Sequence, residues 1–370
     1  MPIVCPYCLS TLDSGFGAKG VIRSCNVCGD IFKGSFMANQ MLKLGRVPKC
    51  LQSGCLGQYS RLNCSSCQTE LPNDILQYDK YLRFAVVAPS GAGKTVFMTT
   101  MIDEFKKARS LNFFMSHMNR ETLDYYTYNY RMLYEDLDTT GMATGRGSSH
   151  PMQWKLQDMS KQTKSRIPTY SLTMFDGAGE DQADLDPIIS RYIAGSKLIM
   201  LLLDPTKLAG VMREMTDEEY NCAGGDRERV TSEYTQNFIL ELIDYLKSAC
   251  NVNVRQRLKI PVAVVFGKID AVQRHLGSAM VLQSSGHATQ GGFIENESQQ
   301  IHSEISGWME NCGDNLNRLF DANLEKWRYF GVSSFGSLPT SRTKIQRPMP
   351  LRVLDPLIWD LSLEGIVKTI

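Results

Sequence analysis

The pattern of apolar and polar positions changes near residue 78, where apolar runs begin to alternate with amphipathic stretches. Three runs are apolar at almost every position, the pattern of parallel strands buried on both faces: YLRFAVVA (81–88), KLIMLLLD (197–204) and KIPVAVVFG (259–267). In VFMTTMIDEFKKA (96–108), apolar residues recur every fourth position, at Phe97, Met101 and Phe105, which predicts an amphipathic helix. The pattern therefore predicts strand, loop and helix units from about Tyr78 onward.

Other stretches extend this picture. We expect strands at 152–158 and 169–176, joined by a polar connection, and helices from 120 to about 137 and from about 233 to 248. Residues 213–234 are charged with mixed sign, which is typical of a solvated excursion. Residues 277–300 are polar and rich in Gly and Ser, which is typical of a partner surface or a disordered insertion.

Eight of the eleven cysteines lie before residue 70, in four close pairs, whereas Cys222, Cys250 and Cys312 are scattered. In a reducing compartment, close pairs favour a metal over disulfides, and sets of four thiolates suit structural zinc. The sequence predicts two zinc sites, with an iron–sulfur cluster or unrelated buried thiols as the alternatives. Interleaved pairing stays open, but pairing in chain order joins Cys5, Cys8, Cys25 and Cys28 in one site and Cys50, Cys55, Cys64 and Cys67 in the other.

The cysteine-rich segment is too short to bury a large core, so metal coordination is expected to contribute much of its folding free energy. We assign residues 1–74 to two zinc-ribbon modules and residues 75–370 to a second domain. The segment's composition suits phosphate contacts and base stacking on a nucleic acid, and a solvated basic face on a docking module is the alternative. The residues concerned are Lys19, Arg23, Lys33, Lys43, Arg46 and Lys49, with Phe16, Phe32 and Phe36 between them.

The segment VVAPSGAGKTVF (86–97) joins the first predicted strand to the first predicted helix. It matches the phosphate-loop motif G-x-x-x-x-G-K-[ST], except that Ala88 stands at the first glycine, where an added methyl is tolerated if φ is negative. In such a loop the glycines admit backbone N–H groups to the phosphates, the lysine reaches the outer phosphates and the hydroxyl binds Mg²⁺. A Gly-rich turn with an incidental lysine is the alternative. The predicted contacts are Pro89, Ser90, Gly91, Ala92, Gly93, Lys94, Thr95 and Val96.

A predicted strand that ends in an acidic residue follows the phosphate loop along the chain. Asp176 ends the strand predicted at 169–176, and Gly179 follows in a D-x-x-G pattern. An ATPase of the common type has Glu directly after this Asp, whereas Gly177 follows here. The pattern is weak alone, but the two strands predicted before it suggest an antiparallel hairpin.

Further along, KIPVAVVFGKID (259–270) ends in a K-x-D pattern, and WRYFGVSSFGS (327–337) contains two adjacent serines. The phosphate loop, D-x-x-G, an LLLD strand, K-x-D and the serine loop, in this order over residues 80–340, resemble the P-loop GTPases. There the Asp of D-x-x-G holds Mg²⁺ through water and the Gly N–H contacts the γ-phosphate. The Asp of K-x-D accepts hydrogen bonds from guanine, the Lys stem stacks on the base, and a Ser-Ala-type loop cradles it.

The resemblance implies a fold and a set of ligands. The fold is α/β, a mainly parallel sheet with helices on both faces and the nucleotide at the carboxyl ends of the strands. The implied cofactors are GTP or GDP with Mg²⁺, the metal being held by Thr95 and Asp176, beside the two zinc ions. The implied contacts beyond the phosphate loop are Asp176, Gly179, Lys268, Asp270, Ser333 and Ser334.

Several features narrow the resemblance or depart from it. The ribbons, the long segment before the first switch and the ending RVLDPLIWDLSLEGI (352–366) are similar to the bacterial double-GTPase families, found with partner proteins in multigene conflict or stress systems. Gly267 replaces the usual Asn or Thr that braces the phosphate loop. Glu180 occupies the place of the Gln that orients the attacking water, and its charge approaches the γ-phosphate. These departures predict slow hydrolysis until a partner binds.

The first switch is sought in the Gly-rich stretch after the helix predicted at 120–137. Among Thr139, Thr140 and Thr144, the last lies nearest the hairpin and is our choice for completing the Mg²⁺ coordination. Arg146 is a candidate arginine finger in cis. A loop whose threonines bind nothing is the equal alternative. The catalytic candidates are thus Lys94, Glu180 and Thr144.

Composition excludes some classes of partner and location. With 40 basic and 39 acidic residues the net charge is +1, so no overall field draws the chain to nucleic acid or membranes. The apolar run at 198–203 is far shorter than the ~20 residues of a membrane span. The start, MPIVCPYCLS, has neither the basic region nor the apolar core of a signal peptide, so we expect a cytoplasmic protein.

The sequence thus predicts a GTP-binding, slowly hydrolysing switch that controls a partner protein. One alternative is a pseudo-GTPase scaffold whose ribbons bind nucleic acid or protein, and a second is an ATPase with the same loop. The partner surface would lie in the switch regions or the ribbons.

Overall fold

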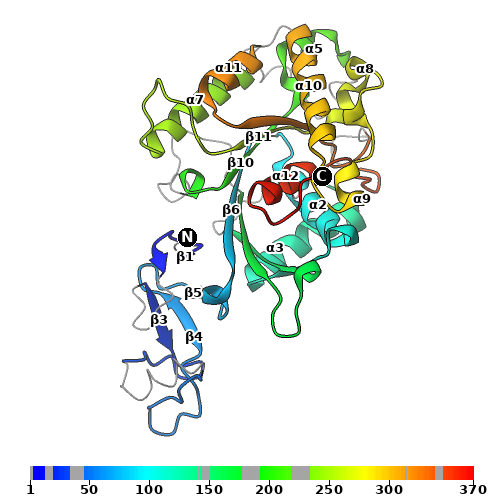
Figure 1. Ribbon diagram of the computed structural model, residues 1–370. Coiled ribbons are helices and arrows are strands. Elements are labelled where there is room, and N and C mark those ends of the chain that lie inside the picture. The colour runs from blue at the N-terminus through cyan, green and yellow to red at the C-terminus, as the bar shows by residue number, and fades with distance from the viewer. Residues whose placement is uncertain are drawn as a thin grey trace.

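The computed structural model describes residues 3–12, 20–33, 46–89, 91–139, 142, 151–176, 192–217, 234–312, 315–337 and 345–370. These residues form a seven-stranded sheet with helices on both faces and, at the N-terminus, two small sheets beside clustered cysteines (Figure 1). The fold is mixed α/β with a mostly parallel sheet, as predicted. Within the described ranges, no helix is long and apolar enough to cross a membrane.

The central sheet has the strand order β12-β11-β10-β6-β9-β8-β7. Strands β12 to β9 in this order are parallel, β8 is antiparallel to β9, and β7 is antiparallel to β8. The carboxyl ends of the five parallel strands therefore share one edge of the sheet. The strands are β6 (Lys80–Val87), β7 (Phe113–His117), β8 (Met152–Asp158), β9 (Thr169–Asp176), β10 (Leu198–Leu203), β11 (Val262–Phe266) and β12 (Trp327–Gly331).

Residues of the central strands alternate between two apolar clusters. In β10, every second residue from Leu198 belongs to one cluster and every second residue from Ile199 belongs to the other. Because both faces are covered, the strand is apolar throughout. One cluster packs on α2 (Lys94–Lys107), α3 (Arg120–Arg131), α9 (Gly286–Gln290) and α12 (Asp355–Leu363). The other packs on α5 (Ala209–Glu214), α7 (Tyr234–Ala249), α10 (Glu295–Asn311) and α11 (Leu316–Asn323).

Several predicted elements are confirmed with small changes at their ends. Strands β8 and β9 occupy the two predicted ranges and pair as the expected antiparallel hairpin. The helix predicted from Arg120 to about Leu137 is α-helical to Arg131 and then widens into a π-helical turn, η3 (Met132–Asp136). The helix predicted at about 233–248 is α7. Strand β7 was not predicted, because FFMSH is short and neither alternates nor stays apolar throughout.

The polar insertion predicted at 277–300 is ordered. It contains η9 (Met280–Leu282), α9 and the start of α10, so the disorder alternative was wrong for this segment. The polar composition gave no sign of this order. The segment is held to the core by its few apolar residues, such as Val281 and Phe293, which are buried. The remaining short turns are η1 (Ile75–Gln77), η2 (Arg109–Leu111), η4 (Met159–Lys161), η6 (Pro205–Lys207), η8 (Ile269–Val272) and α8 (Gln273–Leu276).

The N-terminal part lies at one end of the sheet domain (Figure 1). Its sheets are β1 (Ile3–Val4) with β2 (Thr11–Leu12), and β3 (Val21–Ser24), β4 (Arg61–Cys64) and β5 (Glu70–Leu71) in that order. It contacts the β7–β8 edge of the central sheet: Asn119 donates from Nδ2 to the Tyr7 hydroxyl at 3.1 Å, and Lys155 Nζ lies 2.7 Å from Asp74 Oδ2. Tyr81 and Met118 of the sheet domain also pack on the apolar cluster of the N-terminal part, so the contact surface is both polar and apolar.

Candidate nucleotide site and metal centres

The predicted phosphate loop lies between the end of β6 and the start of α2. Gly91 and Gly93 have φ of 74° and 84°, a left-handed backbone that favours glycine. Gly93 caps α2, so Lys94 and Thr95 form the first turn of the helix, where N–H groups have no partner within the helix. Ala88 is 1% exposed within the apolar core and is not left-handed, which fits its tolerance at this position.

The acidic strand end lies beside this loop. Asp176 ends β9 in register with Val86 of β6, one residue before that strand ends. The backbone thus brings Asp176 to the same edge as the loop. Parts of the prediction lie outside the described residues: Ser90, Thr140, Thr144, Arg146, Gly177, Gly179 and Glu180.

A buried ion pair joins two strand ends to the loop. Asp204 follows β10, and its 1%-exposed side chain lies 2.6 Å from Lys268 Nζ, which follows β11. The Lys268 ammonium also approaches the Gly91 carbonyl at 3.5 Å. Thr206 donates to Asp204 Oδ1 from its backbone N–H and its hydroxyl, at 3.0 and 2.6 Å. Burial by itself would raise the pKa of the Asp204 carboxyl, but Lys268 and Thr206 hold that pKa below its usual value.

Sequence reasoning assigned no role to Asp204, although a carboxylate directly after a fully apolar strand is a usable signal. It also missed Lys207, which lies beside the phosphate loop: an added Cβ at Gly91 would lie 3.6 Å from Lys207 Nζ, and burial lowers the pKa of this ammonium.

Gly267 lies at the same edge of the sheet, where an added Cβ would lie 3.2 Å from Leu202 Cδ1 and 3.7 Å from the Ala92 carbonyl. The usual bracing side chain is absent there, and the Asp204–Lys268 pair occupies the neighbouring position.

The two predicted base-recognition segments meet at the ends of β11 and β12. Ile269 donates from its N–H to the Val332 carbonyl at 3.0 Å, and the Ser333 side chain lies beside the Asp270 carboxyl. Ser333 Oγ also accepts from the Gly336 N–H at 2.8 Å. Asp270 Oδ1 is buried and has no partner among the described residues, and burial raises the pKa of this carboxyl although Ser333 favours its ionised form. Ser334, next in the chain, is half-buried.

The eight N-terminal cysteines form two sets of four, as predicted, but the pairing is nested and not in chain order. The proximal cysteine site joins the first and last pairs, and the distal cysteine site joins the two middle pairs. The prediction that followed chain order was wrong, because β3 pairs with β4 and brings the last pair back toward the first. The sites are Cys5, Cys8, Cys64 and Cys67, and Cys25, Cys28, Cys50 and Cys55.

Three of the four pairs sit on the same backbone turn. In each C-x-x-C, the residue after the second cysteine has positive φ and donates its N–H to the carbonyl of the first cysteine, as Leu9, Gly29 and Gln68 do. A backbone N–H two residues after the first cysteine points to its sulfur at 3.4 Å for Cys5 and Cys25. These N–H groups stabilise thiolates, the form that binds a metal.

The sulfur separations test whether zinc fits. A tetrahedral ion with bonds of about 2.3 Å needs sulfurs about 3.8 Å apart. The Sγ–Sγ distances are 3.8 Å for Cys5–Cys67, 3.6 Å for Cys8–Cys64, 3.7 Å for Cys25–Cys55 and 3.5 Å for Cys28–Cys50. Both sets fit zinc, and neither leaves a position for a substrate.

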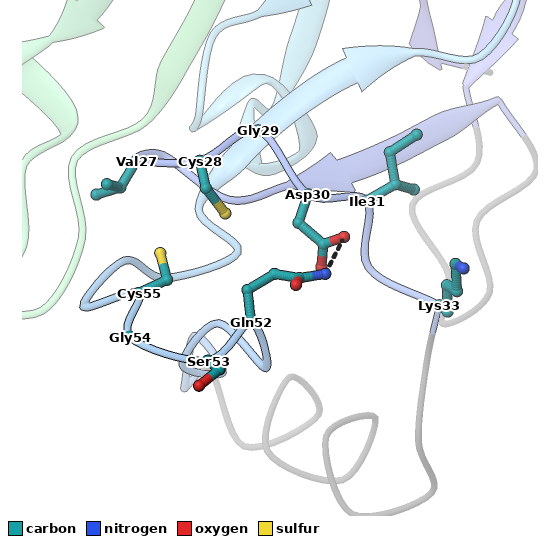
Figure 2. A pocket seen from close by; sticks show the side chains of 10 residues that line it. All are labelled: Val27, Cys28, Gly29, Asp30, Ile31, Lys33, Gln52, Ser53, Gly54 and Cys55. Atoms are coloured by element: carbon teal, nitrogen blue, oxygen red, sulfur yellow. Dashed lines mark hydrogen bonds between the residues drawn. The ribbon is translucent and has the colours of Figure 1, made fainter.

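The distal cysteine site borders an open hollow at the tip of the N-terminal part (Figure 2). Gln52 and Asp30 are hydrogen-bonded at 3.0 Å across one side of it, and Val27, Ile31 and Lys33 are exposed there. Phe32, predicted as a stacking residue, already packs on Tyr59 at 5.0 Å between ring centroids. Of the other predicted contacts to nucleic acid, Arg46 and Lys49 are exposed, Arg23 is half-buried, and Phe16, Lys19, Phe36 and Lys43 lie outside the described residues.

Comparisons with known proteins give structural neighbours only. No protein-family model and no curated protein matches the chain. Solved structures that match include the S. cerevisiae Ski7 GTPase-like domain bound to GTP, at 12% identity and a TM-score of 0.31, over 70% of this chain and 43% of that one. The same domain with GDP and inorganic phosphate matches at equal identity and TM-score, over 70% and 44%. This chain spans under half of those chains, and the values are too low to transfer a ligand or activity.

Proposed function

We propose that this chain binds a guanine nucleotide with Mg²⁺ at the carboxyl edge of its sheet and acts as a slowly hydrolysing switch for a partner protein. The observation that carries the proposal is the Asp270 carboxylate beside Ser333, at the same edge as the phosphate loop. One of its oxygens, Oδ1, is buried and has no partner among the described residues. A buried carboxylate oxygen without a donor is costly, and a ligand with N–H groups would satisfy it.

Guanine is the base with the right donors. Its N1–H and N2–H₂ groups both donate from one edge, so a carboxylate can accept from both. Adenine presents an acceptor at N1, which a carboxylate repels. A site built around such a carboxylate therefore rejects adenine through an unpaired buried charge.

The remaining residues have complementary roles in this proposal. The N–H groups of the loop from Gly91 to Thr95 would surround the phosphates, and Lys94 would neutralise the outer ones. Thr95 and Asp176 would hold Mg²⁺, which supplies charge neutralisation for phosphoryl transfer when bound. Glu180 would orient water less well than a neutral amide, which favours slow turnover and control by a partner. Thr144 is proposed for the first switch.

Two structural zinc ions are proposed for the cysteine sites. A full thiolate set excludes substrate, so their role is to hold the module that presents the distal hollow and the contact with the β7–β8 edge. The partner surface is proposed to lie on this module or in the switch segments, in a cytoplasmic protein. The setting proposed for such a switch, on the sequence resemblance to double-GTPase families, is a multigene conflict or stress system.

Nucleotide identification tests the proposal directly. We expect chromatography of the denatured purified protein, or titration with nucleotide and Mg²⁺, to show GDP or GTP. Retained ATP or ADP would replace the guanine assignment with an ATPase. No binding of either nucleotide would instead favour the scaffold, for which the exposed distal hollow offers a surface.

Asp270→Asn sharpens the test. An amide at this position both donates and accepts, so we expect preference to move from guanine to xanthine nucleotides, with guanine affinity falling about 10-fold to 100-fold. Asp321→Asn is a matched control, because Asp321 lies in α11 and bonds Trp327 Nε1 at 3.1 Å, away from the predicted base. Unchanged base preference in Asp270→Asn would refute the role of this carboxylate.

A further inference from the structure

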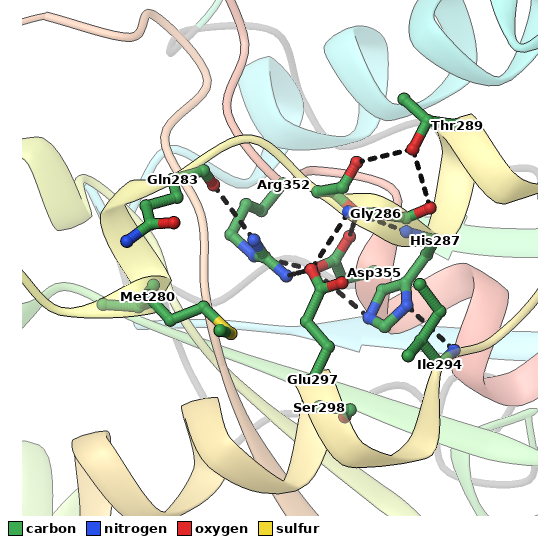
Figure 3. Close-up of polar contacts among 12 residues, drawn as sticks. Met280, Gln283, Gly286, His287, Thr289, Ile294, Glu297, Ser298, Arg352 and Asp355 are labelled. Atoms are coloured by element: carbon green, nitrogen blue, oxygen red, sulfur yellow. Dashed lines mark hydrogen bonds and ion pairs between the residues drawn. The ribbon is translucent and has the colours of Figure 1, made fainter. Parts of the chain in front are cut away.

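A buried ionic cluster joins the insertion after β11 to the C-terminal segment (Figure 3). Its centre is Arg352, whose side chain is 1% exposed. The guanidinium donates from Nε to Asp355 Oδ2 at 2.8 Å, from Nη1 to the Gln283 carbonyl at 3.0 Å, and from Nη2 to Glu297 Oε1. One side chain thus holds α12, the turn before α9 and the first part of α10 together.

The partners of Arg352 are themselves fixed. Glu297 Oε1 also accepts from the Gly286 N–H at 3.0 Å, and Asp355 Oδ1 accepts from the Ser285 hydroxyl at 2.6 Å. Burial opposes ionisation of Glu297, but the Gly286 N–H and Arg352 hold the pKa of its carboxyl below the usual value. The cluster is therefore charged and hydrogen-bonded on both sides of the guanidinium.

His287 completes the cluster without offering a metal site. Its Nδ1 accepts from the Ile294 N–H at 3.0 Å, so its Nε2 carries the proton, and that atom lies 3.7 Å from Asp355 Oδ2. The ring stacks on Phe293 with centroids 5.0 Å apart. Although His287, Glu297 and Asp355 approach one another closely enough to hold a cation, the Arg352 guanidinium already binds both carboxylates.

The backbone is strained at Arg352, directly after the residue that pairs with the serine loop. Its φ is 56°, a left-handed conformation that is unfavourable for a non-glycine residue and persists only where the surroundings impose it. The residue before it, Leu351, exchanges two backbone hydrogen bonds with Ser333, at 3.0 and 2.7 Å. Met349 donates its N–H to the Phe335 carbonyl at 2.9 Å, so residues 349–351 run alongside the serine loop.

This geometry forms a continuous chain of contacts from the cluster to the predicted base site. Arg352 fixes the direction of the chain at Leu351, Leu351 fixes the backbone of Ser333, and the Ser333 side chain lies beside the Asp270 carboxyl. Gly336 packs closely against the same segment, because an added Cβ would lie 2.1 Å from the Met349 carbonyl oxygen. Releasing Arg352 would therefore free the loop that positions the carboxylate.

We propose that Arg352, with Glu297 and Asp355, is a positioning residue for base recognition, acting through the Leu351–Ser333 pairing on Asp270. This inference rests on the proposed guanine site and deepens it: base selectivity depends on the C-terminal segment and the insertion, which lie outside the phosphate loop. It also gives a role to the R-x-x-D start of the ending RVLDPLIWDLSLEGI.

Competition binding of GDP and ADP to the full chain tests the inference. In Arg352→Lys the charge remains, but one ammonium cannot reach all three acceptors. We expect GDP affinity to fall about tenfold and ADP affinity to change little, so the GDP-to-ADP preference drops. A folded Arg352→Lys with lower thermal stability and an unchanged preference would overturn the proposal. Glu297→Gln, which keeps the shape, should show a smaller drop and serves if Arg352→Lys does not fold.

The control is Arg328→Lys. Arg328 also bonds α10, at Ser298 Oγ (3.1 Å) and Glu295 Oε1 (2.5 Å), yet it has no contact with residues 349–352 among the interactions described. Its variant should keep the wild-type preference, and an equal drop in both variants would contradict a specific role for Arg352.

Hydrogen exchange separates this inference from the proposed function. In nucleotide-free protein, Arg352→Lys should speed exchange of the Ser333 and Leu351 amides, whatever nucleotide the chain binds. If wild type prefers no guanine nucleotide, the proposed function fails. If wild type prefers guanine but exchange at Ser333 is unchanged in Arg352→Lys, the inference fails alone.

Discussion

The N-terminal module and the sheet domain maintain their folds by different means. The sheet domain has an apolar cluster on each face of its sheet. The module has one small cluster, which includes the buried thiols Cys5 and Cys64 of the proximal site. The distal site belongs to none of the apolar clusters found in the described residues. The difference predicts that one chain combines a self-sufficient core in the sheet domain with a module whose fold depends on metal.

Metal removal should separate the two parts most strongly. Zinc binding by small thiolate modules is worth about 10–16 kcal/mol, as much as or more than the whole stability of most domains. We expect two zinc ions per chain by elemental analysis and, after chelation, loss of the module's structure with the sheet domain still folded. Limited proteolysis would show cleavage confined to the N-terminal region.

Cysteine variants make this prediction specific. Cys25→Ser should lose one zinc ion and leave the proximal site filled, because the nested sites share no ligand. Cys250→Ser is the control, because Cys250 follows α7 and belongs to neither site. A module that stays protected from protease after complete metal loss would show that its apolar cluster suffices.

A cavity introduced by mutation into the core of the sheet domain should destabilise that domain and leave the zinc sites unchanged. Trp154 in β8 is 0% exposed and packs edge-on against Tyr126 at 5.5 Å between centroids. We expect Trp154→Ala to lower the free energy of unfolding of the sheet domain by about 3–5 kcal/mol, measured by urea denaturation, with zinc content unchanged. Trp154→Phe keeps most of the ring and should cost much less. Zinc loss in Trp154→Ala would mean that the two folds are coupled.

Removing the buried ion pair should have a smaller effect with a pH signature. Asp204→Asn leaves the Lys268 ammonium half-buried without its carboxylate, which should cost about 2–3 kcal/mol. Because the folded pKa of Asp204 is lowered, its contribution to stability is present above the unfolded pKa of about 3.9 and is lost as pH falls through the lower folded pKa. The difference in unfolding free energy between wild type and variant should therefore shrink from pH 6 to pH 3. A constant difference would exclude the ion pair as its source.

The two parts also differ in how much of their structure the sequence could predict. Apolar runs located β6, β10 and β11, because a strand buried on both faces has one signature. The four cysteine pairs located the metal ligands. Their pairing was beyond local patterns, because it depends on β3 pairing with β4 over some forty residues. Arg352 was equally hidden, since nothing in RVLDP indicates a buried guanidinium, and only the fold brings Glu297 to it.

The contact between the two parts should have the smallest effect. The pair of Lys155 in β8 and Asp74 in the module is 29% and 37% exposed, so solvent screens it, and such pairs contribute about 0–1 kcal/mol. Although burial alone would raise the pKa of Asp74, Lys155 and Tyr78 hold it below its usual value. We expect Lys155→Met to leave zinc content and sheet stability within about 0.5 kcal/mol of wild type. Because the ion pair orients the module without stabilising either fold, the measurable change should be faster hydrogen exchange at the module's contact residues. A loss of sheet stability as large as that of Asp204→Asn would contradict the separation of the two folds.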